Sequence, residues 1–415
     1  MKKKIFKSIC TIILSVNLLS LMGCGQYADT DESIRSSVLK IIEDVSGKVS
    51  DVSSLIGDYS SNTDIEKTLA EAGKKPIPPE TNQERFKDCY VYNTLSEEEQ
   101  IAYSEIYDCI VDFKESAVLN TEDIQVVAKA ANAILSDHGG IFWIDGYGYT
   151  SWTEKNTNEI LYIEFEPNYT MTDEERSAYQ SEIDTEVNNI LAGLPEDADD
   201  YGKIKYFYET LIKTVEYDIT SSQNQNIIST FINKRTVCMG YANAMQYLLE
   251  KEGIPCTIIT GYANGESHAW NLVKLDGDFY YTDTTWGNPN FLDGSKPEGY
   301  IDYKYLNVTT EDIEKTHVSE EDFMLPECTA SSDNYYVREG LYFDTFDENT
   351  IGNIFSDAYN ENAPFVSVRF SDFLSYSSCV EYFIDNQKIF DYCQVSNGIS
   401  YGEDDDNNIF TVFFT

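Results

Sequence analysis

The chain has 415 residues, a hydrophobic fraction of 42% and a formal net charge of −43. Such a negative charge repels phosphate backbones, so nucleic acids are excluded as expected partners. The hydrophobic fraction is high enough to build packed cores, which excludes global disorder, and the length predicts two or three folded units.

The first 23 residues have the pattern of a bacterial secretory signal. Four lysines within residues 2–7 precede a mostly apolar stretch from Ile9 to Met22, which is too short for an ordinary transmembrane helix. The stretch ends Leu21-Met22-Gly23-Cys24 and resembles a lipobox, although a residue smaller than Met22 is usual there. We therefore expect cleavage before Cys24, lipidation of that cysteine and an extracytoplasmic protein anchored to the bacterial cell membrane by its lipid. The alternative is an ordinary signal peptide with an incidental cysteine.

A helix, a linker and a mixed region follow the anchor. Apolar residues between Ile34 and Ile56 recur mostly at spacings of three and four, which predicts an amphipathic helix, either in a coiled coil or packed on the body. The segment 73–79, rich in proline, predicts a stiff linker. Region 83–194 combines helices that begin with capping-box patterns, at Ser96 and Thr172, with two strands. A strand and turn are expected at Ile141–Tyr147, and a returning strand is expected at Ile160–Glu166.

The next region, from about residue 195 to 328, carries a set of residues suited to nucleophilic catalysis. Cys238 stands where a helix pattern begins, and free backbone N–H groups at a helix start favour a thiolate and can hold an oxyanion. An acyl-transferring thiol also needs a base and a group that orients the base. His268 is the candidate base, and Asp283 is the candidate orienting carboxylate.

A predicted hairpin brings His268 and Asp283 together. Strands at Ser267–Lys274 and Phe279–Thr285 flank Asp276-Gly277, a strong turn signal. With a two- or four-residue loop, residues whose numbers sum to 553 face each other, so His268 and Asp283 become diagonal neighbours on one face of the sheet. A loop with an odd number of residues would put them on opposite faces. Asp276 and Asp278 are rival carboxylates, but they have the character of turn residues.

These motifs together resemble the transglutaminase-like superfamily, in its bacterial extracytoplasmic branch. The resemblance covers roughly residues 195–290. The motifs that carry it are Val215-Glu216-Tyr217-Asp218, Val237-Cys238-Met239-Gly240-Tyr241-Ala242, Ser267-His268-Ala269-Trp270-Asn271, Asp276-Gly277 and Tyr281-Thr282-Asp283-Thr284-Thr285-Trp286.

The resemblance implies an α+β fold with a papain-like core, in which the helix bearing Cys238 packs on an antiparallel sheet bearing His268 and Asp283. It also implies that Cys238 is the nucleophile, His268 the general base and acid, and Asp283 the residue that orients His268. The backbone N–H of Cys238 is one candidate oxyanion donor, and Gln223 or Gln225 is a guess for a second.

The tryptophans, the other two histidines and the other cysteines of the chain are expected to lie outside the catalytic chemistry. We expect Trp270 and Trp286 to pack and to exclude water from the site. His138 and His317 have no partner nearby in sequence and are expected at the surface. Seven cysteines lie outside the signal and anchor, and Cys89–Cys109 or Cys379–Cys393 could form disulfides, although spacing alone establishes neither.

The C-terminal segment from about residue 330 predicts a small α+β accessory domain. Its clearest expected strands are Tyr335–Phe343, Phe365–Phe370 and Ile409–Phe414. Asp404-Asp405-Asp406 falls in an expected turn, where a solvated loop is favoured over a calcium site. The predicted division of the chain is 1–23 signal peptide, 24–82 anchor, helix and linker, 83–194 N-terminal α+β region, 195–328 transglutaminase-like domain and 329–415 C-terminal domain.

The predicted function is that of a cell-surface thiol enzyme that acts on peptide or amide bonds through a thioester. Hydrolysis is favoured over transamidation, no cofactor or metal is needed, and the partners are a peptide or protein substrate and the membrane that holds the anchor. The competing hypotheses are a catalytically silent binding protein with a transglutaminase fold, and a carbohydrate-binding lipoprotein suggested by the many tyrosines.

Overall fold

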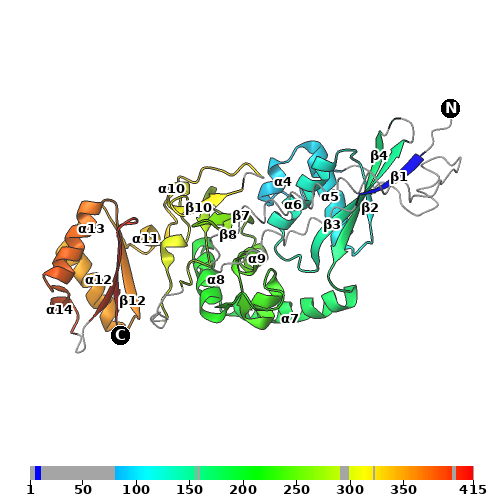
Figure 1. Ribbon diagram of the computed structural model, residues 1–415. Helices are drawn as coiled ribbons and strands as arrows, with labels where there is room; N and C mark the ends of the chain where they lie inside the picture. Colours follow the sequence, from blue (N-terminus) through cyan, green and yellow to red (C-terminus); the bar gives the residue numbers. More distant parts are fainter. Residues whose placement is uncertain are drawn as a thin grey trace.

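The computed structural model describes residues 5–10, 80–154, 157, 159–289, 299–320, 323–394 and 399–414. The predicted lipidation site Cys24, the amphipathic helix and the proline-rich linker lie outside the described residues. The described part mixes helices with antiparallel sheets, as the sequence predicts, in three successive parts along the chain (Figure 1). Within it, no helix is both long and apolar enough to cross a membrane.

The N-terminal part joins three helices to a four-stranded sheet of order β1-β3-β4-β2. Both expected capping boxes are confirmed, at Ser96 with Glu99 and at Thr172 with Glu175. The elements are α4 (Tyr90–Thr94), α5 (Glu97–Val111), α6 (Ile124–Asp137), β1 (Ile5–Cys10), β2 (Ala117–Leu119), β3 (Ile144–Glu154) and β4 (Ile160–Tyr169).

Two strands of this sheet differ from expectation. Strand β3 begins at Ile144 rather than Ile141 and continues to Glu154. The strand is longer than expected because it pairs with β4 from Ile144 to Thr153, which satisfies its backbone groups along that length. The backbone of β1 pairs antiparallel with β3, and the interpretation of residues 1–23 as a signal peptide remains a prediction.

The middle part places a buried helix against a second antiparallel sheet. Helix α9 packs against β7 and β8, in a sheet of order β10-β7-β8-β9. Its residues from Gly240 to Leu249 are all buried, as befits a helix inside a core. The elements are α7 (Asp173–Ala192), α8 (Asp200–Thr214), β5 (Glu216–Tyr217), β6 (Arg235–Thr236), α9 (Cys238–Lys251), β7 (Cys256–Ala263), β8 (Glu266–Leu275), β9 (Asp278–Thr282), α10 (Thr310–Ile313) and β10 (His317–Ser319).

One hydrophobic core runs through the N-terminal and middle parts. Its members come from both sides of residue 194, between Phe86 and Leu306, so the expected boundary falls inside this core. A buried polar bridge adds to this continuity. The side chain of Gln246 on α9 accepts a hydrogen bond from the backbone N–H of Gly139 and donates one to the carbonyl of Asp137. Helix α9 is therefore held from both sides of the expected boundary.

The C-terminal part has a core of its own, between a sheet of order β11-β12-β14-β13 and the helices on one face of it (Figure 1). The expected strand Phe365–Phe370 is confirmed, and the last expected strand spans Ile409–Phe413. The expected strand Tyr335–Phe343 is wrong, because Asn334 caps a short helix there and Gly340 then turns the chain with φ of +70°. The elements are α11 (Tyr335–Arg338), β11 (Tyr342–Phe343), α12 (Glu348–Asn360), β12 (Phe365–Phe370), α13 (Phe373–Val380), α14 (Ile389–Tyr392), β13 (Ser400–Asp404) and β14 (Ile409–Phe413).

The seven cysteines from Cys89 to Cys393 are all free thiols. Neither Cys89–Cys109 nor Cys379–Cys393 forms a disulfide in this structure. Cys379 and Cys393 instead lie buried in the core of the C-terminal part, where burial raises the pKa of each thiol.

Candidate active site

Cys238 is the first residue of α9, as the sequence predicts. Val237 precedes it in an extended conformation and supplies no side-chain cap, so the first backbone N–H groups of the helix have no capping side chain. These groups and the helix dipole favour an anionic sulfur at this position. The thiol is half-buried, which leaves it open to a substrate.

The loop before α9 is fixed closely against the start of this helix. The hydroxyl of Thr236 donates to the carbonyl of Asn224 at 3.0 Å, and the amide of Asn243 donates to the carbonyl of Gln225 at 2.9 Å. Gly240 is needed here, because a Cβ at this position would collide with the Thr236 hydroxyl and lie 3.1 Å from the Asn224 carbonyl. The packing of this loop therefore holds the position of Cys238.

The hairpin that carries His268 has the register that the sequence predicts. Asn271 faces Thr282 and Leu275 faces Asp278, so facing residues sum to 553 across a two-residue turn. Asp276 and Gly277 both have positive φ, at 52° and 96°, as such a turn requires. Strand pairing ends at Thr282, and Asp283 follows directly after it.

His268 and Asp283 form a buried pair. The Nε2 atom of His268 lies 2.8 Å from Oδ2 of Asp283, and Asp283 is fully buried. Burial lowers the pKa of His268, but the charge and hydrogen bond of Asp283, together with the Cys238 thiol, outweigh burial and raise this pKa to about 10. Because Nε2 is occupied by Asp283, the Nδ1 edge of the ring is the one left for Cys238. Asp276 and Asp278, the rival carboxylates, lie exposed at the opposite end of the hairpin.

Asp283 is fixed at both carboxylate oxygens. Its Oδ1 accepts hydrogen bonds from the backbone N–H of Thr285 at 2.9 Å and of Trp286 at 3.1 Å. Burial raises the pKa of Asp283, but the charge and hydrogen bond of His268, followed by those of His317, hold it well below its usual range. Asp283 is therefore an anion that cannot rotate freely.

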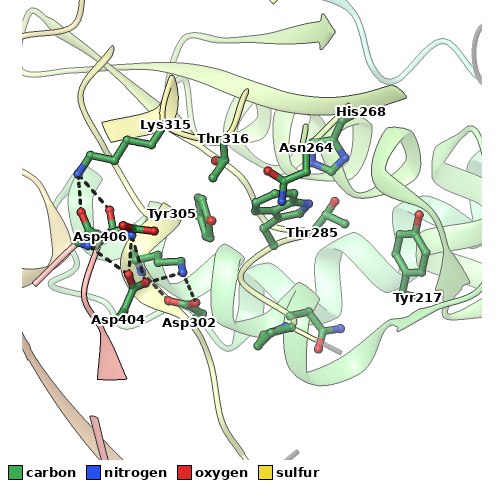
Figure 2. Close-up of a pocket in the computed structure, with 15 residues that line it drawn as sticks. Tyr217, Asn264, His268, Thr285, Asp302, Tyr305, Lys315, Thr316, Asp404 and Asp406 are labelled. Atoms are coloured by element: carbon green, nitrogen blue, oxygen red, sulfur yellow. Dashed lines mark hydrogen bonds and ion pairs between the residues drawn. The ribbon is translucent and has the colours of Figure 1, made fainter. Parts of the chain in front are cut away.

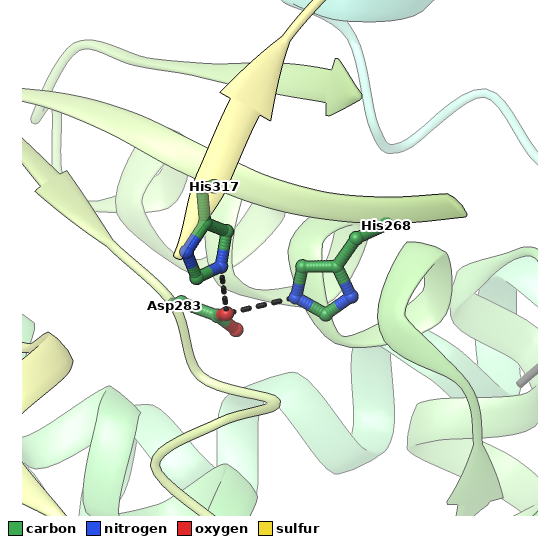
Figure 3. Close-up of side chains that lie close together, drawn as sticks. All are labelled: His268, Asp283 and His317. Atoms are coloured by element: carbon green, nitrogen blue, oxygen red, sulfur yellow. Dashed lines mark hydrogen bonds and ion pairs between the residues drawn. The ribbon is translucent and has the colours of Figure 1, made fainter. Parts of the chain in front are cut away.

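His317 is a part of this site that sequence reasoning missed. The prediction that it lies at the surface is wrong, since only 1% of it is exposed and its Nε2 atom lies 3.0 Å from Oδ2 of Asp283 (Figure 3). His138 is half-buried in the N-terminal part, rather than at the surface as predicted. Its ring lies 2.8 Å from the Tyr103 hydroxyl, and burial with the nearby charge of Arg85 lowers its pKa to about 3.

His268, Asp283 and His317 each offer a metal-ligating atom, all within 4.8 Å of one another, and they form the one such group in the described residues. Both imidazoles already share a hydrogen bond with the same carboxylate oxygen. The arrangement is therefore complete in polar contacts as hydrogen-bonded side chains alone, without an ion.

Aromatic rings surround the two histidines. Trp270 is buried, with its ring centre 6.1 Å from that of His268 and 5.0 Å from that of His317. Trp286 lies 5.8 Å from His268 and 4.7 Å from His317 by the same measure. Trp270 thus has the expected packing role, whereas Trp286 is half-buried and also lines a cleft.

This cleft has a volume of about 880 Å³ and is lined both by His268, the candidate base, and by residues of the C-terminal part. Figure 2 shows His268 and Thr285 toward one end of it and Asp404 and Asp406 toward the other, with Tyr305 between. Asp404 ends β13, so a turn of the C-terminal sheet lines the same cleft as the candidate base.

The two glutamines considered for an oxyanion hole lie in the loop that packs on α9. Gln223 is exposed. Gln225 is half-buried, and its Nε2 donates to Asn224 at 3.1 Å, while its Oε1 is buried without a hydrogen-bond partner. A role for either side chain remains a prediction.

Comparison with known proteins identifies the middle part of the chain. Residues 189–285 match the model of the transglutaminase-like superfamily. A curated relative, kyphoscoliosis peptidase of Mus musculus, is 26% identical over 133 residues, which cover 27% of this chain and 20% of the relative. The chain therefore matches only about a fifth of the length of that relative.

Two solved structures are also similar to this chain. A crystal structure of a TGase has 14% identity and a TM-score of 0.26, and covers 45% of this chain and 56% of its own. The periplasmic domain of TgpA from Pseudomonas aeruginosa has 11% identity and a TM-score of 0.21, and covers 34% and 70%. TM-scores this low carry no argument of their own, so the identification rests on the family match. Residues 189–285 of this chain thus form a transglutaminase-like domain, similar to the superfamily that the sequence motifs resemble.

Proposed function

We propose that this chain is a cell-surface thiol enzyme that cleaves peptide or amide bonds through a thioester on Cys238. The observation that supports this function best is the buried His268–Asp283 pair, in which the pKa of His268 is raised by Asp283 and by the thiol of Cys238 at the start of a helix. Nucleophile, base and orienting carboxylate come from three different elements, and each has the environment that its role needs.

In the first half of the reaction, the Cys238 thiolate attacks the carbonyl carbon of the substrate amide. The backbone N–H at the start of α9 is placed to hold the oxyanion that forms. The C–N bond then breaks, and His268, as an imidazolium, gives its Nδ1 proton to the leaving amine. Asp283 keeps the ring oriented and stabilises its positive charge throughout.

In the second half, an acceptor resolves the thioester. Water gives a proton to His268 and adds to the carbonyl carbon, after which the C–S bond breaks and a carboxylic acid leaves. An amine in place of water gives a new amide by the same steps. We favour water, because the curated relative at 26% identity is named a peptidase.

The experiment is incubation of the purified protein with a peptide library, with and without a primary amine, followed by mass spectrometry. Hydrolysis gives shortened peptides whose summed masses include one water, whereas transamidation incorporates the amine. We expect the first outcome, together with an acyl adduct on Cys238. Cys238→Ala should abolish both products and adduct, and His268→Ala should come close to this.

Cys256→Ala is the matched control. Cys256 lies on β7, and burial raises the pKa of its thiol, so it is a poor nucleophile and its loss should leave the adduct intact. Full activity in Cys238→Ala would refute the proposed nucleophile. No product and no adduct with any peptide, together with alkylation of Cys238 no faster than that of a free peptide cysteine, would favour a catalytically silent binding protein.

The cell-surface location rests on the sequence around Cys24, and its test is separate. The mature protein should partition into detergent, and its first residue should be a diacylated Cys24. Recovery of a mature form with unmodified Cys24 would contradict the anchor without affecting the proposed chemistry.

A further inference from the structure

One carboxylate oxygen of Asp283 lies within hydrogen-bond distance of two imidazole rings. His268 on β8 lies 2.8 Å from Oδ2, and His317 on β10 lies 3.0 Å from the same atom (Figure 3). A carboxylate oxygen has two lone pairs, so it can accept both hydrogen bonds at once. The proposed triad uses only one of these two histidines.

The ring of His317 is held in place on every side. Its Nδ1 lies 2.8 Å from the Thr316 hydroxyl, and its backbone pairs with Ala263 on β7. Trp270, Trp286 and Tyr305 pack around the ring, with centres 5.0, 4.7 and 5.9 Å away. When the Thr316 hydroxyl donates to Nδ1, the proton of a neutral His317 stands on Nε2 and points at Asp283.

We propose that His317 is a positioning residue for the triad, which holds the Asp283 carboxylate turned toward His268. This proposal rests on the proposed function and deepens it. Two backbone N–H groups fix Oδ1, and the two histidines fix Oδ2, so the carboxylate has no rotational freedom left. His317 lies beyond residue 285, where the match to the superfamily model ends.

The test follows the rate at which iodoacetamide alkylates Cys238, measured against pH in the full chain. The rate reports the thiolate that His268 stabilises, so it depends on how well Asp283 orients this ring, and it needs no known substrate. The other ionisable groups close to Asp283 are Tyr208 and Tyr305, and burial raises the pKa of both phenols, so they stay neutral over the range of the assay.

His317→Phe keeps an aromatic ring among its neighbours but removes the N–H donor. We expect the midpoint of the alkylation profile to move to higher pH by about half a unit to one unit, and kcat/KM to fall roughly tenfold where a substrate is known. His317→Gln retains an N–H donor at a similar reach and should recover most of the loss. A role in packing alone would instead predict the same midpoint in both variants.

His138→Phe is the control, because His138 is the remaining histidine outside the triad and lies half-buried in the N-terminal part. The midpoint of the alkylation profile of this variant should equal that of the unsubstituted protein. Thermal melting of all variants shows whether each one is folded. An unchanged or lower midpoint in a folded His317→Phe would overturn the positioning role alone. If Cys238 in the unsubstituted protein reacts no faster than a free peptide cysteine, both this proposal and the proposed function are overturned.

Discussion

Lys304 Nζ lies 2.8 Å from the Asp404 carboxylate and so joins the middle part of the chain to the last sheet. Both side chains line the cleft that reaches His268, and each is about a quarter exposed. Burial lowers the pKa of Lys304, but the charges of Asp302, Tyr305 and Asp404 outweigh it and raise this pKa above its ordinary value. The ion pair therefore fixes one wall of the cleft relative to the catalytic residues.

Asp404→Asn should raise KM several-fold with little change in kcat, since the pair lies at the far end of the cleft from His268. Loss of the ion pair should cost about 1 kcal/mol of coupling in a double-mutant cycle with Lys304→Met. Steady-state kinetics on the best library peptide measures the first effect, and urea unfolding measures the second. Glu403→Gln, an exposed position on β13, is the control. A KM for Asp404→Asn equal to that of the control would show that the C-terminal sheet plays no part in substrate binding.

Gly240→Ala should destabilise the start of the catalytic helix. The new methyl group would displace Thr236, whose hydroxyl also lies 2.6 Å from that of Ser229, and the cost should be about 1–3 kcal/mol. The matched control is Gly202→Ala in α8, where the nearest atoms to a new Cβ are 3.3 Å away. There the higher helix propensity of alanine, about 1 kcal/mol, should leave stability equal or improved. Urea unfolding compares the two, and equal losses would argue against close packing at Gly240.

The His268–Asp283 pair should make stability depend on pH in a defined direction. The folded pKa of His268 is raised to about 10, so its contribution is fully present below about pH 6.5 and is lost as pH rises toward 10. Asp283 has a lowered pKa, so its contribution is present above about pH 4 and is lost as pH falls below that. The pair should therefore stabilise the fold most between about pH 4 and 6.5.

Urea unfolding of the unsubstituted protein and of His268→Gln at pH 6, 8 and 10 measures this effect. The difference in unfolding free energy should shrink with rising pH, by at most about 1.4 kcal/mol per unit. Groups common to both proteins cancel in the difference. A difference that stays constant from pH 6 to 10 would mean that His268 titrates as it does in the unfolded chain.

Gln246→Leu tests the polar bridge between the N-terminal and middle parts. Leucine has a similar size but leaves the Gly139 N–H and the Asp137 carbonyl without this partner in a buried place. Unpaired buried groups of this kind cost about 1–3 kcal/mol each, so a marked fall in melting temperature is expected. Gln180→Leu on α7, which removes more exposed hydrogen bonds to Asp184 and Tyr247, should cost less. The opposite order would mean that the bridge contributes little.

The parts of the site that the sequence predicted depend on local signals. Asp276-Gly277 fixes the turn, the turn fixes the register, and the register places His268 beside Asp283. Cys238 is recognisable because a helix pattern begins at that residue. Each of these features is readable over a few residues, which is why the hairpin and the helix start agree with the structure.

His317 could not be found by the same reasoning. It lies 34 residues beyond Asp283, on a strand of three residues with too little alternation to be recognised. Its position depends on long-range pairing of β10 with β7, which no local pattern specifies. The one feature of the sequence that pointed to His317 is that the chain has only three histidines, so each of them was worth considering as a site residue.

The core that α9 shares with the N-terminal part also decides how the chain around the candidate site can be divided. The segment that matches the superfamily model begins at residue 189, within α7, and leaves out α5 and α6, which pack into the same core. A chain that began there would present apolar surface to water where these helices should lie. A cut in the loop between α7 and α8 should have the opposite result, because the two pieces would still hold each other through the shared core. The transglutaminase-like segment is thus not expected to fold by itself. A shortened protein that keeps the site must also retain the chain from about residue 80.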